Sequence, residues 1–186
     1  MWFQQIVREE SGCASYMLAS SETGECLVFD PLWDIEPYLK LAARKSVRIV
    51  HVVDSHSHAD HVSGARRLAL ATGARLSLPQ RIEVTYEASR LKDGENLRMG
   101  EVEAEVLHVP GHRPEQINLL LRDRSRGAQP WGLLSADFLL VGDLARPDLA
   151  QPGREGAVAL GHAAGLDRVL HRGNSAFLSV VPARRP

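Results

Sequence analysis

The chain has 186 residues, of which 44% are hydrophobic, and its formal net charge is −1. This length fits a single domain over residues 1–186 that is large enough to bury a sizeable core. The near-neutral charge, and the lack of a basic patch with interleaved aromatic residues, exclude a typical nucleic-acid-binding protein. No apolar run approaches the roughly 18 residues that a membrane span needs. We therefore expect neither nucleic acid nor a membrane as a partner.

The cellular compartment is indicated by the first residues and by the cysteines. Residues 1–5 lack the basic start and the long apolar stretch of a secretory signal. Cys13 and Cys26 are the only cysteines. Without a secretory signal, we expect both to be free thiols in a reducing cytoplasm.

Hydrophobic runs separated by turn-forming residues predict a series of short strands. In chain order, we expect strands at residues 3–7, 15–19, 26–29, 48–53, 74–78, 96–99, 102–109, 117–121, 131–134 and 176–181. Helical patterns predict helices at residues 35–45, 62–73 and 155–170, the first of them capped by Asp34. The stretch 83–92 is ambiguous and is expected to be mostly loop.

The strand at residues 48–53 leads into an unusual cluster of polar residues. Its β-branched residues are hardly interrupted, which is typical of a central strand buried on both faces. It is followed directly by Asp54-Ser55-His56-Ser57-His58-Ala59-Asp60-His61. Ligands gather at the carboxyl ends of strands in α/β folds, and imidazole and carboxylate groups bind Zn, Fe or Mn. The sequence therefore predicts a metal site on the turn between this strand and the next helix.

The spacing His56-x-His58-x-Asp60-His61 resembles the signature of the metallo-β-lactamase superfamily, and the similarity extends over most of the chain. The resemblance implies an α/β fold, a four-layer αβ/βα sandwich of two mixed sheets with helices outside and the metal at one edge. Pro110-Gly111-His112 and Ser135-Ala136-Asp137 resemble two further metal-binding segments of the family. They imply that His112 and Asp137 bind metal.

Two departures from these family segments are visible in the sequence. Arg113, Glu115 and Gln116 replace the small residues that are commonest after the histidine, which leaves the ligand intact but alters the local pocket. Ala136 replaces the common glycine, and it adds strain if the turn needs a positive φ.

The stretch 141–149, Val-Gly-Asp-Leu-Ala-Arg-Pro-Asp-Leu, resembles the persulfide dioxygenase branch of the superfamily, which is related to the glyoxalase II thioester hydrolases. Within it, we expect Arg146 to bind the substrate, because a guanidinium suits a carboxylate or persulfide anion. A surface salt bridge is the alternative role for Arg146.

The resemblance implies a mononuclear Fe(II) site held by His56, His112 and Asp137, since two histidines and one carboxylate form the facial triad of non-haem iron enzymes. The expected reaction is the oxidation by O2 of glutathione persulfide, or a similar small thiol persulfide, to sulfite and thiol. His58, Asp60 and His61 are expected to support catalysis around the metal. Two alternatives stay open: a Zn-dependent thioester hydrolase of the glyoxalase II type, and a non-catalytic or truncated paralogue.

The number of metal ions depends on the last residues of the chain. A second metal in this superfamily would use Asp60, His61, a bridging Asp137 and a late histidine, but Arg184 stands at the late position. A permanent cation cannot ligate a metal, so one metal per chain is expected. His162 and His171 are the possible substitutes. The oligomeric state is left open, and a homodimer is compatible with the sequence.

Overall fold

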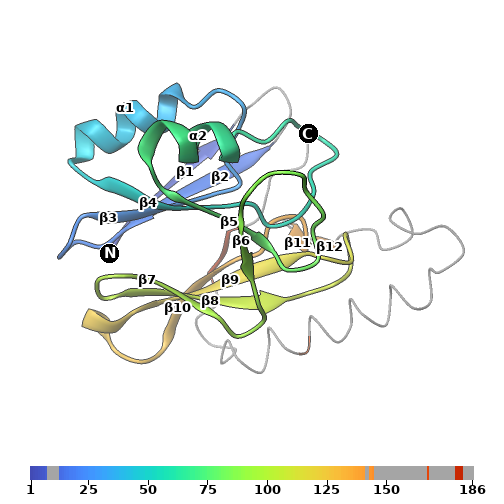
Figure 1. Ribbon diagram of the computed structural model, residues 1–186. Helices are drawn as coiled ribbons and strands as arrows, with labels where there is room; N and C mark the ends of the chain where they lie inside the picture. Colours follow the sequence, from blue (N-terminus) through green and yellow to red (C-terminus); the bar gives the residue numbers. More distant parts are fainter. Residues whose placement is uncertain (8–12, 141–142, 145–166, 168–178, 182–186) are drawn as a thin grey trace, which may run out of the picture.

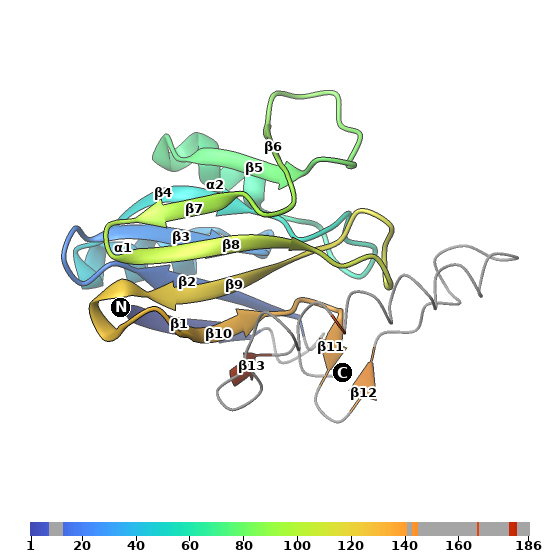
Figure 2. The ribbon, with the colours of Figure 1, turned by 90° about the horizontal axis from the view of Figure 1, so that it is seen from below.

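The computed structural model describes residues 1–7, 13–140, 143–144, 167 and 179–181 (Figure 1). Two mixed β-sheets pack face to face, and two helices cover the outer face of the first sheet (Figures 1 and 2). The α/β sandwich expected from the sequence is thus confirmed. The helix expected at residues 155–170 lies outside the described residues, apart from Asp167, which is helical.

The first sheet has six strands in the order β1-β2-β3-β4-β5-β6. Its first three strands are antiparallel, and β3, β4, β5 and β6 run parallel to one another. The strands are β1 (Trp2–Val7), β2 (Ala14–Ala19), β3 (Glu25–Phe29), β4 (Arg48–Val53), β5 (Arg75–Pro79) and β6 (Ser89–Leu91). As expected for a strand of β-branched residues, β4 lies in the interior of the sheet, between β3 and β5.

The second sheet has five strands in the order β13-β10-β9-β8-β7. All its pairs are antiparallel except β10 with β13. The strands are β7 (Asn96–Met99), β8 (Val102–His108), β9 (Ile117–Asp123), β10 (Pro130–Leu134) and β13 (Ser179–Val181). A 3-10 turn, η1 (Arg124–Arg126), joins β9 to β10, and a small hairpin of β11 (Leu139–Leu140) and β12 (Asp143–Leu144) follows β10.

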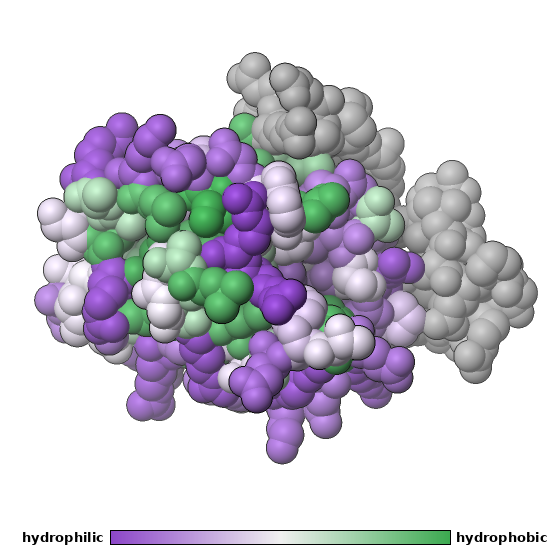
Figure 3. All heavy atoms as spheres, turned by 45° about the horizontal axis from the view of Figure 1, so that its top comes forward, coloured by the Kyte–Doolittle hydropathy of each residue, from purple (hydrophilic) through white to green (hydrophobic). Residues whose placement is uncertain are grey.

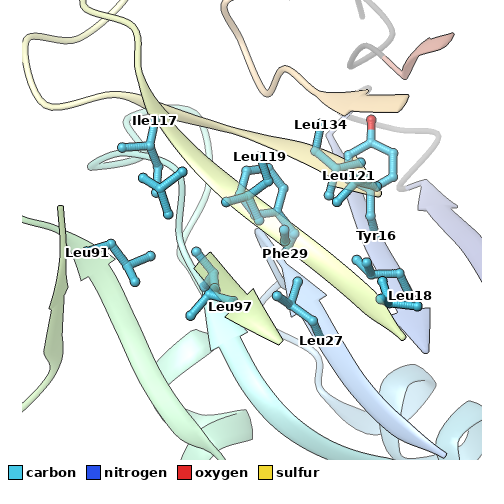
Figure 4. Close-up of a cluster of buried hydrophobic side chains, with 14 of the residues drawn as sticks. Tyr16, Leu18, Leu27, Phe29, Leu91, Leu97, Ile117, Leu119, Leu121 and Leu134 are labelled. Carbon is cyan, nitrogen blue, oxygen red and sulfur yellow. The ribbon is translucent and has the colours of Figure 1, made fainter. Parts of the chain in front are cut away.

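Apolar side chains from the facing surfaces of the two sheets form the main core (Figure 4). They alternate along the strands with residues that face outward, as the pleat of a strand requires. The fully buried members of this core include Tyr16, Leu18, Leu27, Phe29, Leu119 and Leu121. A second cluster, which includes Met17, Val28, Tyr38 and Leu68, joins the first sheet to the helices.

Both helices begin later than the sequence indicates. α1 (Glu36–Lys45) has Ile35 at its N-cap position without a side-chain cap, whereas Asp34 Oδ1 accepts a hydrogen bond from Glu36 N at 3.1 Å. The prediction of Asp34 as the N-cap was therefore wrong by one residue. α2 (Ala65–Thr72) starts three residues after the predicted position and ends, as expected, at Gly73. No helix in the described ranges is long and apolar enough to span a bilayer.

The start of α2 is fixed by contact with the β3–α1 loop. Gly64 N donates to Pro31 O at 2.8 Å, and a Cβ atom on Gly64 would lie 2.0 Å from Leu32 O. Only glycine permits this close approach of two backbones. The contact holds the loop after β4, which carries the histidine cluster, against the loop after β3.

One strand was missed in the sequence. Residues 89–91 form β6, parallel to β5, inside the stretch that was expected to be mostly loop. The surface that carries the helices mixes hydrophilic and hydrophobic patches (Figure 3). Among the described residues, the large apolar side chains that are exposed are Trp33, Val62 and Leu70.

Candidate metal centre

Three loops meet at one edge of the sandwich. The first follows β4 and carries His56, the second joins β8 to β9 and carries His112, and the third follows β10 and carries Asp137. Ile117 N, at the start of β9, donates to Ser55 O at 2.9 Å, which ties the two sheets together at this edge. The loops are thus anchored on strands of both sheets, which makes their relative positions rigid.

His56, His112 and Asp137 lie together, as the sequence-based ligand set requires. Asp137 Oδ2 is 3.6 Å from His56 Nε2 and 3.7 Å from His112 Nε2. The two imidazole rings meet edge to face with centroids 5.0 Å apart. One ligand atom from each residue lies within 4.8 Å of the other two, a spacing that allows one metal ion to contact all three.

The environment of His56 suits a metal ligand. Its Nδ1 is 2.7 Å from Ser55 Oγ, while its Nε2 is buried and has no hydrogen-bond partner among the described residues. A buried polar atom of this kind is costly unless something binds it. Burial, together with the charge of neighbouring His58, lowers the pKa of His56 to about 3. The ring is therefore neutral and presents a lone pair at Nε2, which is the form that binds a divalent metal.

His112 and Asp137 are more exposed, with 28% and 27% of their side-chain surfaces accessible. Burial lowers the pKa of His112 and raises that of Asp137, although each is opposed by the other's charge. Both groups are thus poorly solvated in their charged forms. A divalent cation between them would stabilise the carboxylate and take the imidazole lone pair, so this donor set fits a bound metal.

His58 is oriented by a residue that the sequence analysis missed. Its Nε2 is 3.2 Å from Asp30 Oδ1, and Asp30 also accepts a hydrogen bond from Ser55 N at 2.6 Å. Burial lowers the pKa of His58, but the charge of Asp30 and its hydrogen bond outweigh burial and raise that pKa to about 9. His58 Nδ1 lies 3.8 Å from Asp60 Oδ1 and has no hydrogen-bond partner among the described residues. It could bind a metal together with His56 and Asp60 only after losing its proton.

Asp60 and His61 both lie next to His58. The rings of His58 and His61 are 4.2 Å apart, and Asp60 Oδ1 is 3.3 Å from His61 Nδ1. Asp60 can therefore orient the imidazole of His61. The hydrogen bond with His61 is the main factor that lowers the pKa of Asp60.

Cys13 is the second residue near the site that the sequence did not indicate. Its Sγ is 3.4 Å from Asp60 Oδ2, and neither Cys13 nor Cys26 is in a disulfide. It precedes β2 and is 47 residues from Asp60 in sequence, so no local spacing signals the contact. Asp30 could have been found, because it ends β3 beside the carboxyl end of β4, where ligands gather.

Comparison with known proteins identifies the family. The family model described as the metallo-beta-lactamase superfamily matches residues 8–174. The chain belongs to the metallo-β-lactamase superfamily. Among curated relatives, human persulfide dioxygenase ETHE1 is 26% identical over 149 residues, which are 80% of this chain and 56% of the relative. Hydroxyacylglutathione hydrolase from Polaromonas sp. is 37% identical over 128 residues, 67% of this chain and 46% of the relative.

Solved structures agree with this assignment. A metallo-beta-lactamase from Staphylococcus aureus superposes with a TM-score of 0.89 at 30% identity, covering 98% of this chain and 55% of that one. ETHE1 from Myxococcus xanthus superposes with a TM-score of 0.78 at 26% identity, covering 91% and 70%. The chain spans about half the length of the curated relatives it matches. Its fold is the metallo-β-lactamase fold.

The residues that depart from the superfamily's pattern after His112 connect the ligand loops. Glu115 accepts hydrogen bonds from Ser57 N, at 3.1 Å, and from Ser57 Oγ, and Arg113 Nε donates to Ser57 O at 3.3 Å. Gln116 Nε2 lies 3.4 Å from Ser135 O, next to the Asp137 turn. These larger residues therefore fix the three loops relative to one another.

Ala136 takes the strained conformation that the sequence suggested, with a φ of 44°. An L-residue in the left-handed region costs roughly 1–2 kcal/mol, which glycine avoids. We expect Ala136→Gly to raise the free energy of unfolding by about 1 kcal/mol, because the gain is partly offset by the greater freedom of the unfolded chain. Urea unfolding of the metal-free protein measures this change. Ala69→Gly, inside α2, is the control and should lower the free energy of unfolding by roughly 0.5–1 kcal/mol. If both substitutions destabilise the protein, Ala136 is not strained.

Four predicted residues lie outside the described part of the chain. They are the substrate-binding candidate Arg146 and the candidates for the late metal position, His162, His171 and Arg184. Their roles stay predictions.

Proposed function

We propose that the protein is a mononuclear Fe(II) persulfide dioxygenase, which oxidises glutathione persulfide or a similar small thiol persulfide to sulfite and thiol in the cytoplasm. The observation that carries the proposal is the convergence of His56, His112 and Asp137, two imidazoles and one carboxylate around one point. This donor set leaves coordination positions open, as non-haem iron oxygenases require. The similarity to human persulfide dioxygenase ETHE1 supports the substrate class.

The residues around such a metal would have different roles. Ferrous iron held by the three ligands would supply the activation of O2 for oxygen transfer to sulfur. Ser55 fixes the ring of His56 through Nδ1, so that Nε2 faces the other ligands. Asp30 holds His58 in its charged form beside them, which places a cation and a proton donor next to an anionic persulfide. Arg146 is proposed to bind the anionic end of the substrate.

A Zn-dependent thioester hydrolase is the second candidate. It is favoured by the hydroxyacylglutathione hydrolase from Polaromonas sp., which is more identical in sequence than ETHE1 over the part matched. The same three ligands suit zinc, which would supply a bound hydroxide for attack on a carbonyl. The two functions differ in metal and in their need for O2.

Anaerobic purification with metal analysis, followed by paired assays, distinguishes the two candidates. Metal-free protein is reconstituted with Fe(II) or with Zn²⁺, and each form is given glutathione persulfide or a glutathione thioester. We expect O2 uptake with sulfite formation in the iron form only. Thioester hydrolysis without O2 uptake would overturn the proposal and support the hydrolase.

Arg146 provides a test of substrate binding. If Arg146 contributes equally to the binding of substrate and of transition state, Arg146→Ala raises KM and leaves kcat unchanged. The expected increase in KM is about 10-fold, because a lost charge-assisted hydrogen bond costs roughly 1.5 kcal/mol. Iron content should not change. Arg126→Ala, in the exposed turn η1, is the matched control. Equal kinetics of both variants and the wild type would assign Arg146 to a surface role.

A further inference from the structure

Arg113 is held at the rim of the metal centre by two different loops. It follows the candidate ligand His112 directly in the chain. Its Nε donates a hydrogen bond at 3.3 Å to the backbone oxygen of Ser57, the residue between His56 and His58. The guanidinium group is therefore fixed beside the histidines of both loops, at the place where a substrate must pass to reach the metal.

The positive charge of Arg113 is not balanced by a carboxylate. In the described part of the chain, the partly buried Arg113 forms no ion pair, whereas Arg122 pairs with Glu105 at 2.8 Å. Glu115, the nearest acidic residue on the same loop, accepts hydrogen bonds from the backbone and hydroxyl groups of Ser57 instead. An unpaired cation next to a metal centre attracts an anionic ligand to that place.

The guanidinium group of Arg113 has hydrogen-bond donors left over. It carries five N–H groups, and the bond to Ser57 O uses the one on Nε. The four remaining N–H groups belong to the two terminal nitrogens, which form a planar fork that matches the two oxygens of a carboxylate. Small residues are commonest at this position in the superfamily, so the fork is a feature of this chain rather than of the shared metal centre.

We propose that Arg113 is a specificity-determining residue that binds the glycyl carboxylate of glutathione, or the matching carboxylate of a similar small thiol, while the sulfur lies at the metal. In glutathione these two groups are about two residues of extended chain apart, roughly 7 Å. The glycyl carboxylate is the isolated anion, because the γ-glutamyl carboxylate stands beside its own ammonium group. The inference rests on the proposed function for the class of substrate, and it leaves the γ-glutamyl carboxylate to Arg146.

Binding to the zinc-loaded protein in the absence of O2 tests this role apart from the reaction. Calorimetry compares glutathione with its glycyl ethyl ester, which lacks the negative charge. The wild type should bind glutathione about 10-fold more tightly, because the ester loses a charge-assisted hydrogen bond. Arg113→Gln should bind both equally. Arg126→Gln, in η1 at the opposite end of β9, is the matched control and should keep the wild-type ratio.

Coenzyme A, a thiol that carries phosphates, distinguishes a carboxylate site from a phosphate site. Arg113→Gln should weaken the binding of coenzyme A less than that of glutathione. If Arg113→Gln fails to retain zinc, Arg113→Lys replaces it, because a lysine lacks the planar fork and should reduce the ratio of glutathione to ester affinity to below about 3-fold.

Three results would overturn the role of Arg113: equal wild-type affinities for glutathione and its ester, an unchanged ratio in Arg113→Gln, or a larger loss for coenzyme A than for glutathione. No turnover is measured in these experiments. If the expected affinities are found but the iron-loaded protein takes up no O2, the dioxygenase proposal fails and the carboxylate site at Arg113 stands.

Discussion

His112→Ala and Asp137→Ala are each expected to remove the proposed catalytic iron and with it the proposed oxygenase activity. Each change deletes one of three ligands, and even residues that only support metal ligands typically cost 10–100-fold in affinity or activity. We therefore expect affinity for Fe(II) to fall by more than about 100-fold. Both side chains are more than a quarter exposed, so the fold should persist. Metal analysis after anaerobic reconstitution, with circular dichroism as a check on folding, measures the effect.

His61→Ala is the control for this experiment. The imidazole of His61 lies in a group with Cys13 and Asp60, and not in the His56–His112–Asp137 group proposed to hold the iron. Iron content should therefore be largely kept in His61→Ala. Loss of iron in the His61 variant, or retention of iron in both ligand variants, would show that the iron lies elsewhere.

Asp30→Ala is expected to cause the largest loss of stability among the residues around the site. Asp30 is 3% exposed, and it pairs with His58 and accepts the hydrogen bond from Ser55 N. Removing one partner of a buried pair leaves an uncompensated charge, which costs about 3–5 kcal/mol. Urea unfolding of the metal-free protein measures the change. The control is Asp34→Ala. The exposed carboxylate of Asp34 accepts a hydrogen bond from Glu36 N at the start of α1, so its loss should lower the free energy of unfolding by about 1 kcal/mol.

The effect of Asp30 should depend on pH. Burial alone would raise the pKa of Asp30, but the charge and hydrogen bond of His58 outweigh burial and lower that pKa. The stabilisation by Asp30 is therefore present above the unfolded pKa of about 3.9 and is lost as the pH falls below it. His58 has a folded pKa of about 9. Its contribution is complete below the unfolded value of about 6.5 and is lost as pH rises through 9. The difference between wild type and Asp30→Ala should be greatest at about pH 5–6.5. A difference that does not vary from pH 5 to pH 9.5 would contradict the charged pair.

The sequence predicts the local part of the site well. His56, His58, Asp60 and His61 are close in sequence, and the strand before them places them at a sheet edge, where the structure finds them. Asp30 and Cys13 were missed because strand pairing brings them to the site from other parts of the chain. Nothing in the local pattern around Cys13 distinguishes a residue beside a metal centre from an ordinary buried thiol.

For the fold too, features set by the local sequence were predicted, and features set by long-range contacts were missed. Strands with many hydrophobic residues, such as β8 and β9, were predicted within two residues. β6 was missed because Ser89, Arg90 and Leu91 have little strand pattern of their own, and pairing with β5 makes them a strand. α2 starts late because Ser63 forms a β-bridge with Leu32 and Gly64 N donates to Pro31 O. These long-range backbone contacts prevent residues 62–64 from joining the helix, and local helix propensity cannot predict them.

The ratio of sulfite formed to O2 consumed tests the central claim most directly. Iron-reconstituted protein is given glutathione persulfide in an oxygen-electrode cell, and sulfite is measured in the same sample. Oxidation of one persulfide by one O2, with one water, gives one thiol and one sulfite, so the account predicts equimolar O2 uptake and sulfite formation. The reaction should be absent in Asp137→Ala. Sulfite formation without O2 uptake, or no consumption of O2 by fully iron-loaded protein, would contradict it.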